Sequence, residues 1–161
     1  MLDGLLDVEA LFDTVERSAF RLEPLPRTGP PVDARDLAQD LAQDLVLHLP
    51  WFDAVRRAVD AGRVVQRVRI VDRPPTPYQR FELSLAPFQA EAGEEVRFLS
   101  APVARDLSLP PLDFWLLDDQ RVVTLDDLGA QVISEPAVVL RMRRYRDVAW
   151  RHAVPFDRVA D

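Results

Sequence analysis

The chain has no cysteine, no lysine and no asparagine among its 161 residues. Without cysteine there is no disulfide, no thiol chemistry and no thiolate ligand for a metal. Without lysine there is no Schiff-base catalysis, no lysine general base and no Walker-type lysine at a phosphate. All 20 basic residues are therefore arginine, a bias that a GC-rich coding sequence would produce.

Histidine and glycine are scarce as well. His48 and His152 are the only histidines, so a histidine-rich metal site is excluded. The five glycines form neither GxGxxG nor GxxxxGKS, and no serine lies in a GxSxG elbow. The acidic pairs Asp118–Asp119 and Asp126–Asp127 could hold a hard cation such as magnesium, but both fall at predicted turns, where aspartate is common. We therefore expect no catalytic residue set, no metal and no cofactor.

Length, composition and charge indicate one domain outside the membrane. A chain of 161 residues with 48% hydrophobic residues forms one domain. We divide it into a mainly helical part over 1–62, a sheet-containing core over 63–135 and a C-terminal helix over 136–153. There is no apolar run near the ~20 residues of a membrane span and no basic, apolar leader, so we expect a cytoplasmic protein without a membrane partner. The net charge of -7 makes direct nucleic-acid binding unfavourable.

Hydrophobic spacing predicts a series of helices and strands. The predicted helices cover 5–18, 36–49, 51–61 after an interruption at Pro50, 76–93 with a break near Pro87, and 134–153. The predicted extended segments cover 19–23, 63–71, 95–100, 113–117, 121–125 and a short piece after Gly129, and 102–111 is predicted to be a loop. This order indicates an α/β (mixed α+β) fold, with a small mixed sheet that holds one parallel strand-helix-strand unit and a hairpin. Helices pack on that sheet, and further helices are added at the N-terminus.

Arginines on the predicted strands are the most suggestive polar residues. Arg67 and Arg69 share one strand face, and we expect Arg97 on the same face of the next strand. An arginine fork could grip a phosphate or carboxylate, with Glu82, Asp113 or Asp118 handling protons or a metal. The alternative is that these arginines pair with acidic residues across the sheet, and the candidates for that pairing are Glu82, Glu94 and Glu95.

The predicted C-terminal helix is rich in arginine, with Arg141, Arg143 and Arg144 in one turn and Arg146 and Arg151 beyond. Such a helix can present a solvated face, or it can dock onto an acidic protein or a nucleic-acid backbone. On an acidic chain we favour a protein partner, with Arg141, Arg143 and Arg144 as the contacting residues.

Six sequence motifs, taken together, resemble an actinobacterial family known only as a domain of unknown function. The motifs are FRLE at 20–23, RVRIV at 67–71, YxxFE at 78–82, EAGEEVRFL at 91–99, DFWLLDD at 113–119 and RDVAW at 146–150. Members of that family are often encoded beside helix-turn-helix regulators, which implies a regulatory or signalling context. This chain departs from the family in its linker, where LAQDLAQD and several prolines replace a more typical segment.

The predicted strand, helix, strand and hairpin also resemble one half of a phospholipase D-like fold. That superfamily carries the motif HxKxxxxD. When its aspartate is aligned on Asp118, the lysine position holds Asp113 and the histidine position holds Pro111. Neither residue can perform the missing chemistry, so this resemblance implies a binding role rather than catalysis.

Two hypotheses follow from the sequence. The first is a non-catalytic regulatory or interaction module that binds a protein partner, such as a helix-turn-helix transcription regulator. The second is an enzyme or small-ligand binder for an anionic phosphate or carboxylate substrate. Homodimerisation through the apolar stripe from Leu37 to Leu49 is conceivable, although burial of that stripe within one chain is the simpler expectation.

Overall fold

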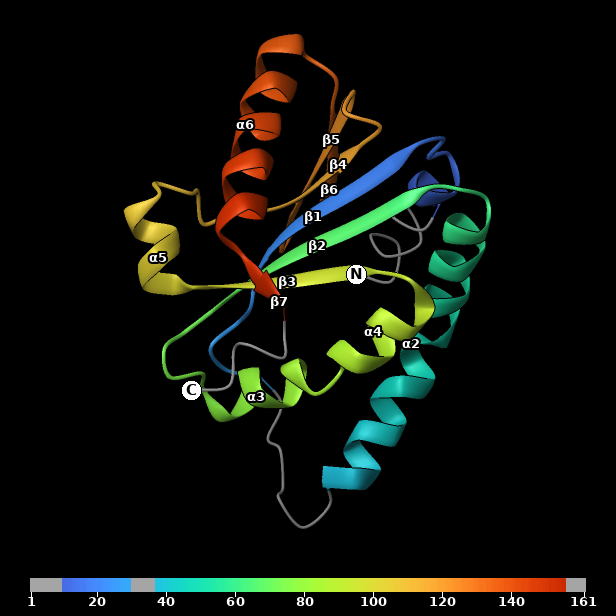
Figure 1. The fold of residues 1–161 in the computed structure, drawn as a ribbon, viewed down its shortest axis with the longest axis vertical. Coiled ribbons are helices and arrows are strands. Elements are labelled where there is room, and N and C mark those ends of the chain that lie inside the picture. The colour runs from blue at the N-terminus through green and yellow to red at the C-terminus, as the bar shows by residue number, and fades with distance from the viewer. Residues whose placement is uncertain (1–9, 30–36, 156–161) are drawn as a thin grey trace.

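A mixed sheet forms the centre of the computed structural model, which describes residues 10–29 and 37–155 (Figure 1). Its strands are β1 Ser18–Pro24, β2 Val64–Val71, β3 Glu95–Ser100, β4 Asp113–Leu117, β5 Arg121–Asp126, β6 Gly129–Ile133 and β7 Val154–Pro155. The helices are α2 Leu37–Asp60, α3 Pro77–Leu83, α4 Ala86–Ala92, α5 Ala101–Asp106 and α6 Pro136–His152. None of the helices in the described residues is both long and apolar enough to cross a membrane.

The seven strands follow the order β6-β5-β4-β1-β2-β3-β7. Strands β1, β2 and β3 are parallel to one another, and β4 runs antiparallel to β1 and forms a hairpin with β5. The mixed sheet, the parallel unit and the hairpin predicted from the sequence are therefore confirmed. The parallel part is larger than predicted, because two crossovers build it: α2 connects β1 to β2, and α3 with α4 connects β2 to β3.

Side chains alternate between the two faces of the sheet, and each face has its own core. On one face Val55 of α2 packs with Val65 and Trp115, while α4 covers Val96 and Phe98. On the other face α6 packs against residues that include Phe20, Phe114 and Leu116. Figure 1 accordingly shows α6 on one side of the sheet and α2, α3 and α4 on the other.

Local signals between β2 and β3 are confirmed by the structure. The Thr76 side chain accepts a hydrogen bond from the Gln79 N–H, and the Gln79 side chain binds the Thr76 N–H in return, which completes a capping box. Pro87 lies in the first turn of α4, so the predicted break separates α3 from α4. Gly93 ends α4 with a φ of 105°, a conformation that favours glycine.

Three predictions of local structure are wrong. The predicted helix over 5–18 continues in the described residues only to Asp13, and Ser18 already begins β1, which lies at the centre of the sheet. Pro50 does not interrupt the second helix, which continues through it as α2. Proline has no N–H to donate within the helix, but Pro50 lies on an exposed side of α2, so water can bind the carbonyl oxygen that is left without a donor. The predicted loop over 102–111 begins with α5, whose first turn accommodates a proline.

The start of β1 is fixed by a carboxylate from the turn between β4 and β5. The Asp118 carboxylate accepts hydrogen bonds from the backbone N–H groups of Glu16, Arg17 and Ser18 at 2.7–3.2 Å. Its own N–H donates to the Ser18 carbonyl oxygen at 2.8 Å. Burial alone would raise the pKa of Asp118, but the three N–H donors outweigh it and hold the pKa below its usual value. The carboxylate therefore stays charged and binds the N–H groups at the start of β1. The chain begins a strand there, where the sequence predicted the end of a helix.

We expect Asp118→Ala to lower the free energy of unfolding by about 2–3 kcal/mol, since three N–H groups would lose a charged acceptor. Asp118→Asn is the matched control, because asparagine tolerates the positive φ of 54° and keeps one acceptor oxygen. Urea unfolding should show the wild type as the most stable of the three proteins, Asp118→Asn as intermediate and Asp118→Ala as the least stable. Equal stability of the alanine variant and the wild type would contradict this anchoring role.

Candidate functional site

Seven charged side chains gather on one face of the sheet, toward the carboxyl ends of β1 and β2. We call this group the arginine–carboxylate cluster. It consists of Arg21 and Glu23 on β1, Arg67 and Arg69 on β2, Asp113 on β4, Glu94 just before β3 and Glu82 on α3. The pairing register places Arg21 beside Arg67 and Glu23 beside Arg69, so alternation along two neighbouring strands points all four at the same face.

Arg67 is buried at the centre of the cluster. Its Nε atom lies 2.5 Å from Glu94 Oε1, and Nη1 lies 3.2 Å from Glu23 Oε1. The guanidinium also lies 5.6–5.8 Å from the ring centroids of Trp51 and Trp115, and the Trp51 indole N–H donates to the Glu94 carboxylate. Because its side chain is only 5% exposed, an unpaired charge here would be costly, and the two carboxylates remove that cost.

The other two arginines of the cluster are paired as well. Arg21 binds Asp113 through two hydrogen bonds of 2.8 and 2.9 Å, in the planar two-point geometry that suits guanidinium and carboxylate. Arg69 binds Glu23 at 2.8 Å, donates to the Glu82 carbonyl oxygen at 3.1 Å and lies 3.9 Å from the Glu82 carboxylate. Each guanidinium of the cluster therefore already has a carboxylate partner.

Electrostatics keep Glu23 and Arg21 ionised at neutral pH. Burial would raise the pKa of Glu23, but Arg21, Arg69 and Arg67 surround this carboxyl and hold its pKa far below the usual range. Burial would likewise lower the pKa of Arg21, and Glu23 together with Asp113 raises it instead. Neither of these two groups can therefore exchange protons near neutral pH, which general acid–base chemistry requires.

The cluster answers the question that the sequence left open about Arg67 and Arg69. Their pairing with Glu94 and Glu82 corresponds to the cross-sheet alternative, whereas Glu95 instead accepts a bond from Gln66 at 3.3 Å. Sequence reasoning missed Arg21, Glu23 and the role of Trp51. The alternation of Arg21 and Glu23 in the extended segment was a usable signal, but it required knowing that this segment is a central strand.

Arg97 does not join the cluster, which corrects the expectation that it shares a face with Arg67 and Arg69. In the parallel register Val96 lies beside Arg67, so Arg97 points to the opposite face. There its guanidinium carbon lies 3.9 Å from the centroid of the Trp150 ring, and Nη1 donates to the Trp150 carbonyl oxygen at 3.0 Å. Arg97 thus ties β3 to the end of α6.

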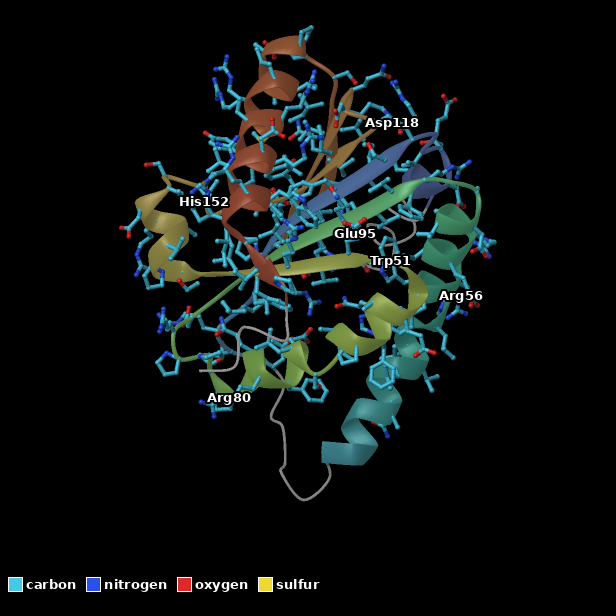
Figure 2. All side chains as sticks on the ribbon, viewed as in Figure 1. Trp51, Arg56, Arg80, Glu95, Asp118 and His152 are labelled. Atoms are coloured by element: carbon cyan, nitrogen blue, oxygen red, sulfur yellow. The ribbon has the colours of Figure 1, made fainter. Side chains whose placement is uncertain are left out.

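Asp118 is also separate from the cluster. It follows β4 at the end remote from Asp113, about 16 Å away for five extended residues. Figure 2 shows Asp118 far from Arg80, which lies on the same short helix as Glu82. Within the described residues, no group of three or more histidine or acidic side chains could hold a metal ion. The carboxylate of Asp118 instead accepts the backbone N–H groups at the start of β1.

The outer surface of α6 is basic. Arg141, Arg143 and Arg144 are all exposed, and Leu140 beside them is 48% exposed. Arg143 reaches Asp119 at 3.9 Å, and Arg146 also pairs with Asp119, which fixes this helix to the turn after β4. Within residues 10–29 and 37–155, Arg141 and Arg144 form no ion pair, so their charges are available to a partner.

The fold and the cluster together define a mixed α/β domain whose interior arginines are all paired. The chain belongs to the family described as Domain of unknown function (DUF6879), whose model matches residues 6–161. This confirms membership of an uncharacterised family, as the sequence motifs suggested. Among curated proteins, none matches the chain.

One solved structure with a similar fold is NucT from Helicobacter pylori, with a TM-score of 0.58 and 11% sequence identity. The match covers 95% of this chain and 91% of that one. The likeness is in line with the phospholipase D-like fold that the sequence suggested, and at this identity it concerns the fold alone. Asp113, which the sequence resemblance alone aligned with the lysine of that superfamily, is bound by Arg21 in this structure.

We expect Arg67→Met to lower the free energy of unfolding by about 3–5 kcal/mol, because the buried Glu94 would lose its arginine partner and Glu23 would lose one of its three. Combining it with Glu94→Gln should cost less than the sum of the two single changes, by at least ~1 kcal/mol. Arg56→Met is a control, since Arg56 is 54% exposed and only 3.9 Å from Asp53, and it should change stability by less than ~0.5 kcal/mol. Additive energies in this urea-unfolding cycle would contradict the coupling.

Proposed function

We propose that this protein is a non-catalytic regulatory or interaction module that docks onto an acidic protein partner through α6. The observation that carries the proposal is the contrast between the two sets of arginines. Those of the cluster are buried and bound to carboxylates, whereas Arg141 and Arg144 are exposed and form no ion pair within the described residues.

The charge distribution supports a protein partner over nucleic acid. Helix α6 carries five arginines and one aspartate, while the whole chain has a net charge of -7. A local basic face on an acidic protein attracts an acidic patch, but long nucleic acid would also meet the repelling remainder of the surface. A helix-turn-helix regulator in the cytoplasm, the partner class that the family resemblance implies, is the specific candidate that we propose.

The alternative function is an enzyme or small-ligand binder for an anionic phosphate or carboxylate. It would use Arg67, Arg69 and the neighbouring carboxylates, and the phospholipase D-like resemblance is what motivates it. Binding an anion there would first require a guanidinium to release its carboxylate. Because the released carboxylate would remain half-buried and unpaired, this exchange is unfavourable.

Affinity capture from the native host tests the proposal, with the full chain as bait. We expect the wild-type protein to retain a regulator that Arg141→Glu/Arg144→Glu loses at least about tenfold, because like charges would then face each other. The matched control is Arg80→Glu/Arg105→Glu, which changes the net charge equally at two exposed arginines away from α6. Equal recovery of all bound proteins by the three baits would refute docking through α6.

Thermal-shift measurements with inorganic phosphate, phosphorylated metabolites and divalent ions test the alternative. A ligand that binds only the folded state raises the melting temperature, by an amount that grows with its concentration. We expect no rise beyond that caused by sodium chloride at the same ionic strength. A saturable rise with a phosphorylated compound, lost in Arg69→Met, would favour the ligand-binding function instead.

A further inference from the structure

The N-terminal half of α2 exposes several large apolar side chains to solvent. Val46, Leu47 and Leu49 are 64%, 77% and 52% exposed. Burial of the Leu37–Leu49 stripe within one chain is therefore incomplete at Leu49. Figure 1 shows this half of α2 projecting away from the sheet, with no other described helix beside its far end. A surface of this kind marks a site where another molecule docks.

A hollow of about 360 Å³ continues this apolar surface toward the body of the protein. It lies between the helical turn at 10–13 and the middle of α2, and Phe12, Leu49 and Trp51 provide its apolar lining. The charged side chains of the lining are Asp13, Asp53 and Arg57. We call the hollow and the exposed residues Val46, Leu47 and Leu49 the α2 groove.

The charged lining of the α2 groove is negative overall. Asp13 and Asp53 outnumber Arg57 there, and Arg56 lies 3.9 Å from Asp53 in an exposed contact. An occupant that satisfies both features must be amphipathic and basic. It needs a large apolar side chain for the hollow and positive charges beside that side chain for Asp13 and Asp53.

The α6 helix of this same chain has that composition. Leu140 is half exposed, and Arg141, Arg144 and Arg151 are exposed around it or at further turns of the helix. Residues 140, 144 and 151 follow helical spacing on one side of α6. The 17 residues of α6 extend about 25 Å, which matches the roughly 21 Å of α2 from residue 37 to residue 50.

We propose that the protein self-associates head to tail, with α6 of one copy bound in the α2 groove of the next copy. This inference shares the basic surface of α6 with the proposed function and names a second copy of this chain as an occupant that competes for it. Within one copy the contact is impossible, because α2 and α6 cover opposite faces of the sheet. Figure 2 likewise shows Arg56 of α2 and His152 of α6 on opposite sides of the molecule.

A contact between two different surfaces of the same chain has a definite consequence. Each copy offers one groove and one α6, so association continues into a closed ring or an open chain of copies instead of stopping at a symmetric dimer. A single helix in a groove buries less than the ~1,000 Å² of a stable interface, so association should be weak and concentration dependent. Its charged rim makes it weaken as salt screens the arginines and aspartates.

Sedimentation velocity and light scattering of the full chain test the inference. At low salt we expect the average mass to rise from the monomer value of 18.3 kDa to at least twice that value with increasing concentration. Added sodium chloride should return it to the monomer value. The groove variant Asp13→Arg/Asp53→Arg and the helix variant Arg141→Glu/Arg144→Glu should each remain monomeric, since both place like charges against each other.

Mixing the two variants is the decisive measurement. The groove variant has a basic groove and an unchanged, basic α6, and the helix variant has an unchanged groove and two glutamates at the contacting positions 141 and 144 of α6. Every contact between the two is therefore complementary, so the equimolar mixture should recover the mass distribution of the wild type. The control Arg80→Glu/Arg105→Glu should self-associate like the wild type, and circular dichroism should show that all variants are folded.

Each outcome of these measurements has one meaning. A wild type that stays monomeric at all concentrations overturns the inference. A symmetric dimer unaffected by either variant also overturns it. If self-association fails while α6 charge reversal still abolishes capture of a regulator, the proposed function stands alone. If self-association occurs and capture is unaffected, only the inference survives.

Discussion

The pairing of buried arginines with buried carboxylates is the constraint on which the arrangement of this protein depends. Burying the Arg67 guanidinium in the interior would be costly if Glu94 and Glu23 were not within hydrogen-bonding distance. Glu94 follows α4 and precedes β3, and Glu23 lies on β1, so one guanidinium joins both neighbours of β2. A shift of β2 by one residue would move Arg67 and Arg69 to the other face, which would leave Glu94 and Glu82 without an arginine partner and Glu23 with Arg21 alone. The ion pairs thus specify the register of the parallel strands, in addition to whatever stability they contribute.

The same pairing limits which surfaces can act on other molecules. A carboxylate with a strongly lowered pKa and an arginine bound at two points have no capacity left for proton transfer or for gripping an anion. The cluster therefore belongs to the scaffold, although it lies toward the carboxyl ends of parallel strands, where α/β folds often bind ligands. Our proposals therefore place recognition on residues that the fold leaves outside, the arginines of α6 and the apolar residues of α2. These two surfaces differ in composition and belong to helices on opposite faces of the sheet.

Sequence reasoning succeeded where a signal is local. The alternating RVRIV segment, the Thr76 cap, the break at Pro87 and the glycine that ends α4 each depend on residues within a few positions, and the structure confirms them. It failed where the outcome depends on pairing between distant segments. The alternation of side chains was predicted correctly within the strand of Arg67 and within the strand of Arg97. Whether the two arginines share a face depends on the register between the strands, and neither strand determines that register alone. The role of Asp118 likewise depends on N–H groups about 100 residues earlier in the chain.

Arg21 and Asp113 show how this sheet neutralises a charged side chain within its own strands. Asp113, at the start of β4, would be a half-buried carboxylate without compensation if no cation lay beside it. Arg21, from the neighbouring strand β1, supplies the positive charge through a two-point contact. The local charge is balanced, and the guanidinium is bound to the protein's own carboxylate. Because the arginines of the cluster are all bound in this way, whereas Arg141 and Arg144 form no ion pair within the described residues, our proposal places recognition on the outer surfaces.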